Sequence, residues 1–234
     1  MRRSMKRFAM LCLVLPAAFF SLHAPRTADA WNDETHISIA RAAGYRKWFN
    51  AAGADMLKIK TEIEGNNHYV NNPLNAAVTP DMVSAQVERY NRIDEAGHLY
   101  GAVIASFREY VKDKKLGKYG EYHMGFCAHY IGDLSQPLHN IEFDAYNQTY
   151  HRAIDGVVND EMPENFSGIE IYSITIRSEE EMAREIARIA NLAIELANRL
   201  ETENRMMTKQ EAYRQLSHSA SLFRAVLAYA KTLL

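Results

Sequence analysis

The sequence predicts an all-α protein, a single-domain helical bundle, and three observations support this fold class. Apolar residues recur at spacings of three and four along most of the chain, which is the period of an amphipathic helix. Residues that favour helix starts precede several of these stretches. Residues of high strand propensity gather in one segment only, IEIYSITI at 169–176, and one isolated strand does not make a sheet.

The expected helices, in chain order, span residues 33–49, 80–90, 98–111, 119–134, 178–202 and 208–233. Pro80 suits the first position of its helix, with Thr79 as the N-cap. Ser178 stands before three glutamates, which is a favourable helix start. Residues 65–75, GNNHYVNNPLN, are polar and rich in asparagine, so we expect a loop there.

Residues 1–30 have the features of a secretory signal peptide. The basic start MRRSMKRF precedes the apolar run FAMLCLVLPAAFF, and Ala-Asp-Ala ends the segment. The apolar run has 13 residues, fewer than the roughly 20 that cross a bilayer as a helix, so an uncleaved membrane anchor is the weaker alternative. We expect cleavage before Trp31, a secreted or periplasmic protein, and one domain over residues 31–234 of the 234-residue chain.

The charge balance of the mature chain is acidic. Residues 1–30 carry five Lys/Arg and one Asp, so their removal leaves 22 basic and 28 acidic residues (27 − 5 and 29 − 1) and a net charge of −6. An acidic protein does not attract phosphate-rich partners by its overall charge. Affinity for phosphate would have to come from local cations or from bound metal ions.

Only one cysteine remains after cleavage. Cys12 falls in the signal segment, which leaves Cys127 alone and the exported protein without an intrachain disulfide. On a helix Cys127 points roughly away from His129. We therefore expect Cys127 to be a small buried apolar residue and not a metal ligand.

Histidine and aspartate recur at helical spacing in the middle of the chain. The stretch HYIGDLSQPLH contains His129, Asp133 and His139, and a spacing of four puts the first two on one helical face. His151 and Asp155 repeat this spacing in YHRAID. Imidazoles and carboxylates are usual zinc ligands, and five of them within 27 residues favour a metal site over unrelated surface residues.

These motifs resemble those of the secreted zinc-dependent phospholipases C and the related S1/P1-type nucleases. The resemblance includes WNDETH, which places Trp31 and His36 at the start of the expected mature chain. In that family the first residue is a tryptophan that binds zinc through its free amino group and its own carbonyl. Cleavage after Ala30 would provide this amine, so the signal-peptide and metal predictions converge. The resemblance covers most of the mature chain and is specific at these motifs only.

The resemblance implies a fold with a trinuclear zinc cleft, with three zinc ions per chain held by nitrogen and oxygen ligands. The ligands implied for the first ion are Asp55, His68, His129 and Asp133. The ligands implied for the second ion are His139, His151 and Asp155. The ligands implied for the third ion are the amine and carbonyl of Trp31, the imidazole of His36, and Asp133 as a bridge to the first ion.

Two ligands of the first ion have competitors in the sequence. His98 competes with His68, which we favour because it lies in HYVNNP, where an aromatic residue directly follows the histidine. The interval before Asp55 is shorter than the resemblance leads us to expect, so Asp81 and Asp94 are alternatives. The ordinary role of these two aspartates would be a helix N-terminal or surface charge.

Four further polar residues near these motifs receive lesser roles. Gln136 and Asn140 flank the ligands, and they would either orient them or cap a helix. His123 and His218 have no partner at metal spacing, and we expect them to be surface or core polar residues.

The resemblance implies an exported phosphodiester hydrolase in which a zinc-bridged hydroxide attacks phosphorus and Asp55 acts as general base. We expect the phospholipase C type, because the interval between His139 and His151 is short, as in the phospholipases. An S1/P1-type single-strand nuclease or 3′-nucleotidase is the nearest alternative, since the step from Trp31 to His36 is similar to that of the nucleases. A non-catalytic metal-binding helical protein, or a helical interaction protein with incidental histidines, are alternatives of another class.

The expected partners are phospholipid head groups, or single-stranded nucleic acid in the alternative. Tyr69 would line a pocket for a quaternary ammonium group or stack on a base. We also expect peripheral contact with a membrane and no obligate protein partner.

Overall fold

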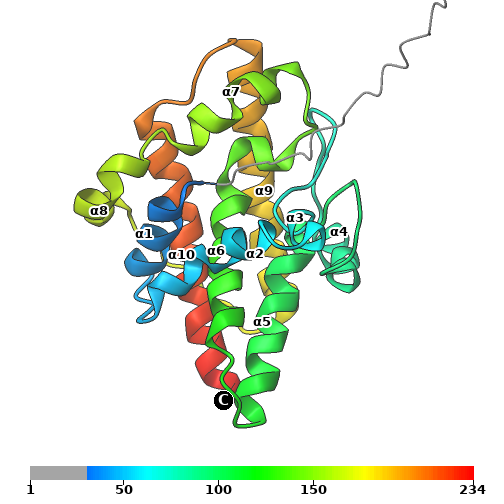
Figure 1. The fold of residues 1–234 in the computed structure, drawn as a ribbon, viewed down its shortest axis with the longest axis vertical. Coiled ribbons are helices and arrows are strands. Elements are labelled where there is room, and N and C mark those ends of the chain that lie inside the picture. Colours follow the sequence, from blue (N-terminus) through cyan, green and yellow to red (C-terminus); the bar gives the residue numbers. More distant parts are fainter. Residues whose placement is uncertain (1–30) are drawn as a thin grey trace, which may run out of the picture.

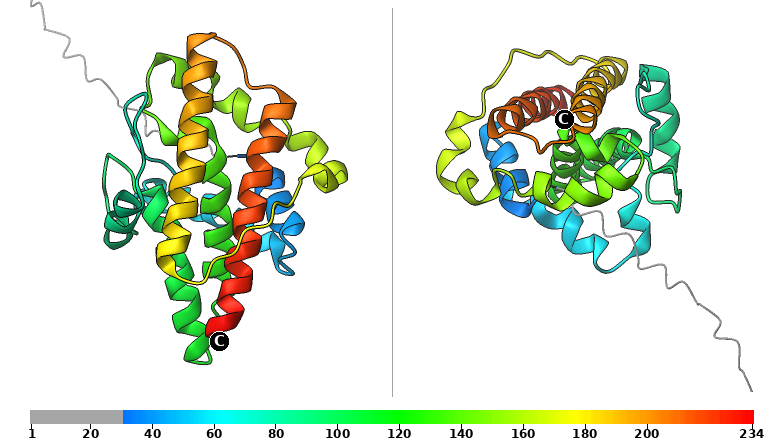
Figure 2. Two further views of the ribbon diagram at one scale, coloured as in Figure 1. Left: turned by 180° about the vertical axis from the view of Figure 1, so that it is seen from behind. Right: turned by 90° about the horizontal axis from the view of Figure 1, so that it is seen from above.

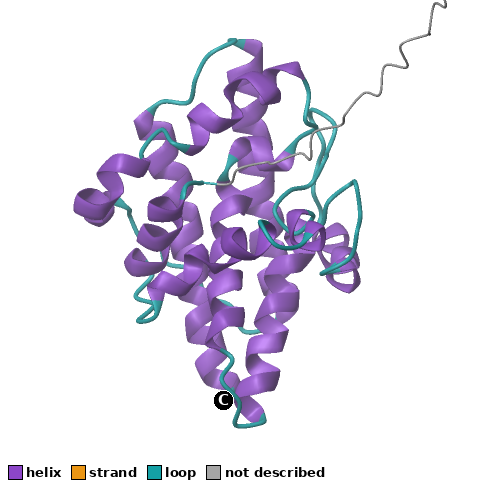
Figure 3. Cartoon of the chain, in the orientation of Figure 1, coloured by secondary structure: helices purple, strands orange, loops and turns teal. Residues whose placement is uncertain are grey.

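The computed structural model describes residues 31–234, so the predicted signal peptide at 1–30 lies outside the described residues. The described chain is mostly helical and has no β strand, which confirms the all-α class (Figure 3). None of the described helices is long and apolar enough to span a membrane.

The α-helices in chain order are α1 (Asp33–Ala42), α2 (Gly53–Lys58), α3 (Glu62–Gly65), α4 (Pro80–Gln86), α5 (Leu99–Lys115), α6 (Glu121–Ser135), α7 (Ala145–Asp155), α8 (Met162–Asn165), α9 (Glu179–Thr202) and α10 (Lys209–Leu233). Short 3-10 helices lie between them: η1 (Trp48–Ala52), η2 (Val87–Arg89), η3 (Pro137–Asn140), η4 (Asn159–Glu161) and η5 (Phe166–Gly168).

Helix α6 occupies the centre of the fold and contacts α1, α2, α5, α9 and α10. Figures 1 and 2 show α9 and α10 behind α6, with α1 and α2 on its front side. Two glycines of α6 allow close approach from that front side. A Cβ at Gly125 would lie 2.5 Å from the Cβ of Asn50, and a Cβ at Gly132 would lie 2.4 Å from Nδ1 of His36. The absence of a side chain at these positions therefore lets η1 and α1 pack directly on α6.

Side-chain caps begin three helices, and two of these caps, Thr79 and Ser178, are at positions that the sequence predicts. The Ser178 side chain accepts a hydrogen bond from a backbone N–H in the first turn of α9. Thr208 and Glu211 form a capping box at the start of α10. Thr79 caps α4, with Pro80 in its first turn. These caps satisfy backbone donors that a helix start leaves without partners.

The helix expected over residues 33–49 is wrong in its second half, because α1 ends at Ala42. Gly44 has a φ of 84°, in the left-handed region that glycine adopts readily at a helix C-terminus. The chain then turns and continues as η1, which packs on α6. This break carries the chain from α1 to α2.

The strand candidate at 169–176 forms no strand in the structure. With no second strand beside it, its backbone bonds to α10 instead. The Glu170 amide donates to Ser217 Oγ at 2.9 Å, and the Tyr172 amide donates to Ser221 Oγ at 2.7 Å. The two serines lie four residues apart on one face of α10, and they satisfy alternate donors of the extended segment.

We predict that Gly101→Ala destabilises the fold by about 1–3 kcal/mol, since overpacking forces the backbone to shift. A Cβ at Gly101 would lie 2.2 Å from the carbonyl carbon of Gln86 at the end of α4. Urea denaturation would measure the change. The matched control is Gly65→Ala, whose Cβ would have no heavy atom within 4 Å. Equal midpoints for both variants would contradict this packing.

Candidate metal centre

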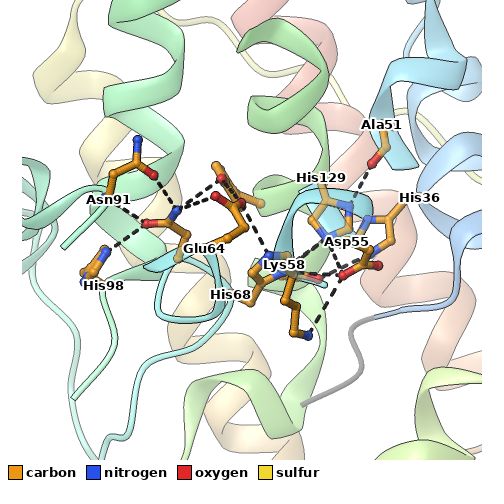
Figure 4. Close-up of polar contacts among 12 residues, drawn as sticks. His36, Ala51, Asp55, Lys58, Glu64, His68, Asn91, His98 and His129 are labelled. Carbon is orange, nitrogen blue, oxygen red and sulfur yellow. Dashed lines mark hydrogen bonds and ion pairs between the residues drawn. The ribbon is translucent and has the colours of Figure 1, made fainter. Parts of the chain in front are cut away.

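Helix α6 carries two of the predicted ligands at the centre of the molecule. His129 and Asp133 are fully buried and lie one turn apart, with 3.4 Å between His129 Nε2 and Asp133 Oδ2. Figure 4 shows that three other segments bring predicted ligands to the same region: His36 from α1, Asp55 from α2 and His68 from the loop after α3.

The first group of side chains consists of Asp55, His68 and His129, whose ligand atoms all lie within 4.8 Å of one another. Nε2 of His129 is 3.2 Å from Nδ1 of His68 and 3.6 Å from Oδ1 of Asp55. Asp133 adds an oxygen, because its Oδ2 lies 2.9 Å from Nδ1 of His68. Ligands of a tetrahedral zinc lie about 3.3 Å apart, given bonds of about 2.0–2.1 Å. The separations therefore suit one ion.

The second group consists of His139, His151 and Asp155, from η3 and α7, and all three are buried. Nε2 of His151 is 3.1 Å from Nε2 of His139 and 3.4 Å from Oδ2 of Asp155. Two imidazoles and a carboxylate at these separations also suit a single divalent ion.

A further group consists of His36, His129 and Asp133. The rings of His36 and His129 stack with centroids 3.7 Å apart, and Nε2 of His36 is 3.3 Å from Oδ1 of Asp133. Neither ring nitrogen of His36 has a hydrogen-bond partner among the described residues, and Asp133 Oδ1 has none either. Buried polar atoms without partners are unfavourable, and a metal ion would satisfy Nε2 of His36 and Oδ1 of Asp133.

The ligand histidines are oriented by bonds at their other nitrogen. Nδ1 of His129 donates to the Ala51 carbonyl at 2.7 Å, and Nδ1 of His151 donates to Oδ1 of Asn147 at 2.6 Å. With the proton on Nδ1, each ring presents the lone pair of Nε2 to the group of ligands. Such partners fix the tautomer and the orientation of metal-binding imidazoles.

His68 connects the first and second groups. Its backbone carbonyl accepts a hydrogen bond from His139 Nδ1 at 2.5 Å, while its ring Nδ1 belongs to the first group. Its ring Nε2 lies 3.5 Å from Oε1 of Glu64, a buried carboxylate that also accepts a bond from the Tyr130 hydroxyl. The sequence interpretation missed Glu64, although its spacing of four before His68 was a signal that could have identified it.

The electrostatics of the first group differ sharply between neighbouring residues. Burial, together with the nearby His36 imidazole, lowers the pKa of His129 to about 3. Burial also opposes protonation of His68, but its hydrogen bonds to Asp133 and Glu64 raise its pKa to about 9. Burial would raise the pKa of Asp133, yet the adjacent imidazoles hold it well below its usual value. Without metal, the proton of the group therefore resides on His68 at neutral pH.

Gln136 both caps a helix and contacts a predicted ligand. Its side-chain oxygen accepts a bond from the Leu138 amide at the start of η3, and its side-chain nitrogen donates to Asp155. Asn140 donates to the carbonyls of Leu134 and Gln136, at 3.0 and 2.8 Å. These two amides hold the turn between α6 and η3 and thereby fix the distance between the two groups.

The alternative ligands lie elsewhere. His98 is buried and lies behind the first group, where its Nε2 is 2.8 Å from Oδ1 of Asn67 and Asn67 in turn donates to Glu64 (Figure 4). Asp94 pairs with Arg89 at 3.1 Å. Asp81 is exposed in the first turn of α4, as expected for a helix N-terminal charge. None of these three belongs to the groups described above.

Three other residues also lie outside the groups. Cys127 is fully buried, and burial raises the pKa of its thiol to about 12, which suits an inert core residue. Nε2 of His123 lies 3.5 Å from Asp113, and the ring of His218 packs against Tyr172.

Trp31 begins the described chain, and its indole is fully buried in the hydrophobic core. The next residue, Asn32, approaches Gly156 directly after α7, where its Nδ2 would lie 3.4 Å from a Cβ. The start of the described chain therefore lies close to Asp155. The cleavage that would free the Trp31 amine lies outside the described residues, so the amine ligand stays a prediction.

A mostly apolar cavity opens beside the second group. Its lining residues are Tyr69, Asn71, Leu138, Ile141, Phe143, Asn147 and His151. The cavity places aromatic rings next to a predicted metal ligand, and it includes the tyrosine that the sequence singles out.

Comparison of the chain with models of known protein families found no match, and comparison with curated proteins found none. The chemistry of the site is therefore inferred from its donor atoms and their geometry. These groups of buried imidazoles and carboxylates can hold a metal ion.

We predict that zinc binding at neutral pH releases about one proton from the first group, since a ligand imidazole must be neutral. His68, with its pKa of about 9, carries that proton in the metal-free protein. Calorimetry in buffers of different ionisation enthalpy would count the protons. The release should fade as the pH rises through 9. Glu64→Gln weakens a contact that raises the pKa of His68, so in this variant the number of protons released should decrease at lower pH than in the wild type. A release that persists unchanged in more alkaline buffer would contradict the assignment.

Proposed function

We propose that the protein is a zinc-dependent phosphodiester hydrolase of the phospholipase C type, with a cluster of three ions. The observation that carries the proposal is the convergence of nitrogen and oxygen ligands on both oxygens of the buried Asp133, whose Oδ2 lies 2.9 Å from Nδ1 of His68 and whose Oδ1 lies 3.3 Å from Nε2 of His36. A carboxylate that bridges two ions in this way would hold them only a few ångströms apart, as in two-metal phosphoesterases. The resemblance of the HYIGDLSQPLH and WNDETH motifs to secreted phospholipases C and S1/P1-type nucleases supports the same chemistry.

Zinc ions bound here would activate water as a nucleophile and stabilise negative charge on phosphoryl oxygens. Asp55 is the partly exposed carboxylate of the site, with a side chain 25% exposed. Although burial opposes ionisation, the imidazoles of His129 and His68 lower the pKa of Asp55. Asp55 is therefore an ionised carboxylate at the edge of the cluster, and we assign it the general-base role.

A cation lies next to this carboxylate. Nζ of Lys58 is 4.0 Å from Oδ1 of Asp55, and its side chain is mostly buried. Figure 4 shows the lysine extending along the edge of the ligand cluster. A fixed ammonium group at this point would bind a phosphoryl oxygen and hold the diester beside Asp55. Nothing in the sequence singled out Lys58 as a phosphate-binding residue, because single lysines are common on helix surfaces.

Exposed apolar side chains near Asp55 favour a lipid substrate. On α2 and directly after it, Met56 is 61% exposed and Ile59 is 88% exposed. Ile63 on α3 is 41% exposed. Apolar residues gathered at the edge of a site are typical of surfaces that contact apolar ligands or membranes. We name Met56, Ile59 and Ile63 the apolar rim.

The aromatic side chains near His151 favour the second candidate, an S1/P1-type nuclease or 3′-nucleotidase. Tyr69 and Phe143 lie beside this predicted ligand, and aromatic faces of this kind stack on nucleobases. The purified zinc-loaded protein should be assayed side by side on phosphatidylcholine and on single-stranded DNA. Turnover of DNA alone would reject the phospholipase. Bound zinc with turnover of neither substrate would indicate a non-catalytic metal-binding protein.

We predict that His129→Ala and Asp133→Asn each lower kcat/KM for the soluble diester bis(p-nitrophenyl) phosphate by at least ~100-fold, because each removes a metal ligand. Elemental analysis should show a parallel loss of zinc. The control is His218→Gln, on α10 outside the ligand groups, which should keep both activity and zinc. Full turnover in the His129 variant would exclude the proposed centre.

A separate prediction concerns the predicted amine ligand. Two extra residues before Trp31 should remove about one zinc ion per chain and most of the activity, because a peptide bond replaces the free amine. Protein that begins at Trp31 is the control. If the extended protein retains three zinc ions and full activity, Trp31 is not a ligand.

A further inference from the structure

The face of α6 that carries the predicted ligands continues beyond them towards the start of the helix. Tyr122, Phe126, His129 and Asp133 follow one another at spacings of four, three and four, so they share one face. The Phe126 ring would lie 3.2 Å from a Cβ at Gly53, so α2 covers this face at that point. Tyr122, one turn closer to the helix start, is 44% exposed. Below α2, the face is therefore open.

The open face leads to the hairpin tip between α5 and α6, at the lower end of the molecule in Figure 1. The tip, residues 112–119, reads KDKKLGKY, with four lysines and one aspartate in a chain whose net charge is −2. Leu116 is 61% exposed and Tyr119 is 63% exposed. A leucine and a tyrosine therefore lie in water among lysines.

Neighbouring segments add cations to the tip. Arg46, Lys47 and Lys231 are exposed and line a surface cavity of about 520 Å³ beside it. Nζ of Lys47 lies 4.7 Å from the centre of the Tyr119 ring, which joins the loop after α1 to the tip. We name residues 112–119 together with these three cations the basic tip.

Carboxylates neutralise only part of this charge. Lys112 pairs with Glu109 at 2.9 Å, and Lys114 pairs with Glu121 at 3.3 Å. The remaining cations of the basic tip form no ion pair with a described carboxylate except for Lys47, which lies 3.8 Å from Glu121. The basic tip thus has a surplus of exposed positive charge.

We propose that the basic tip docks the protein on an anionic phospholipid surface. Exposed lysines and arginines are attracted to anionic head groups. Leu116 and Tyr119 then enter the interface, where aromatic and aliphatic side chains are stable. A polynucleotide would use the cations but would leave Leu116 in water, so the composition favours a membrane.

Docking at the basic tip also has a consequence for the predicted metal centre. Asp133 lies twelve residues beyond Glu121 on α6, which is about 18 Å along the helix. The face of α6 that carries Tyr122 is covered by α2 further along the helix, and the apolar rim lies on and after α2. A membrane in contact with this face would therefore extend from the basic tip towards the apolar rim. This delivery of lipid to the site rests on the proposed function, whereas the docking itself does not.

The test compares the wild-type chain with a variant that combines Lys115→Gln, Leu116→Asn and Lys118→Gln. Sedimentation with vesicles of phosphatidylglycerol and phosphatidylcholine should show binding about tenfold weaker or more for the variant, since each lysine near an anionic surface adds to affinity. The matched control, Arg184→Gln with Arg188→Gln, removes two exposed cations from α9, outside the basic tip. The control should bind as the wild type does.

Hydrolysis separates docking from catalysis. The tip variant should cleave soluble bis(p-nitrophenyl) phosphate at the wild-type rate and vesicle phospholipid more slowly. Binding to anionic vesicles without hydrolysis of either substrate would support the docking surface and reject the proposed hydrolase. Equal vesicle binding by wild type and variant would overturn the docking proposal. So would wild-type binding to neutral and anionic vesicles alike, or a variant that loses affinity for single-stranded DNA but not for vesicles.

Discussion

The buried imidazole–carboxylate pair His129 and Asp133 is the interaction on which the rest of the fold depends. Both side chains are fully buried on the central helix, where an unsatisfied charge or ring nitrogen is strongly unfavourable. Each segment that packs on this face of α6 supplies a polar partner: α1 brings His36, η1 brings the Ala51 carbonyl, and the loop after α3 brings His68. The first part of the described chain is therefore positioned by hydrogen bonds to the buried polar side chains of α6 as well as by apolar packing.

The loop that carries His68 is held by backbone bonds as tightly as a regular element. His139 donates from its ring to the His68 carbonyl, and the His139 carbonyl accepts from the Val70 amide at 2.8 Å. Gly97 makes an isolated bridge with Val70 and lies so close to Tyr69 that a Cβ would be 2.1 Å from the Tyr69 carbonyl oxygen. This irregular loop, bonded to η3 on one side and to Gly97 on the other, joins the first and second groups. Displacement of one group would therefore disturb the other.

The sequence was sufficient where local rules act. The helix starts at Thr79 and Ser178 and the four-residue spacing of the two His-Asp pairs depend on neighbours in the chain, and the structure agrees with both predictions. The sequence was insufficient to predict the local structure where tertiary contacts determine it. The left-handed turn at Gly44 ended a helix that apolar periodicity had extended, and the hydroxyls of α10 took the donors of segment 169–176.

The ligand set shows the same division. His139, His151 and Asp155 are close in the sequence, where spacing paired His151 with Asp155 and the resemblance added His139 to them. Asp55, from a short helix, and His68, from a loop, depended on resemblance, and competing residues stayed open until the structure brought these two together. Partners such as Glu64 and the backbone carbonyls of Ala51 and His68 have no motif. Only the fold shows which of the many carboxylates and carbonyls lie behind a ligand ring.

A metal ion bound to the first group would compete with a proton for the same side chains. In the metal-free protein, the proton on His68 links two buried carboxylates, and its raised pKa means that folding favours the protonated ring. This stabilisation is complete below the ordinary histidine pKa of about 6.5 and is lost as the pH rises through about 9. Metal affinity changes in the opposite sense, because a neutral ring is the ligand. The proton on His68 thus compensates the buried carboxylates up to about pH 9, and a metal ion bound to the same group would compensate them in its place.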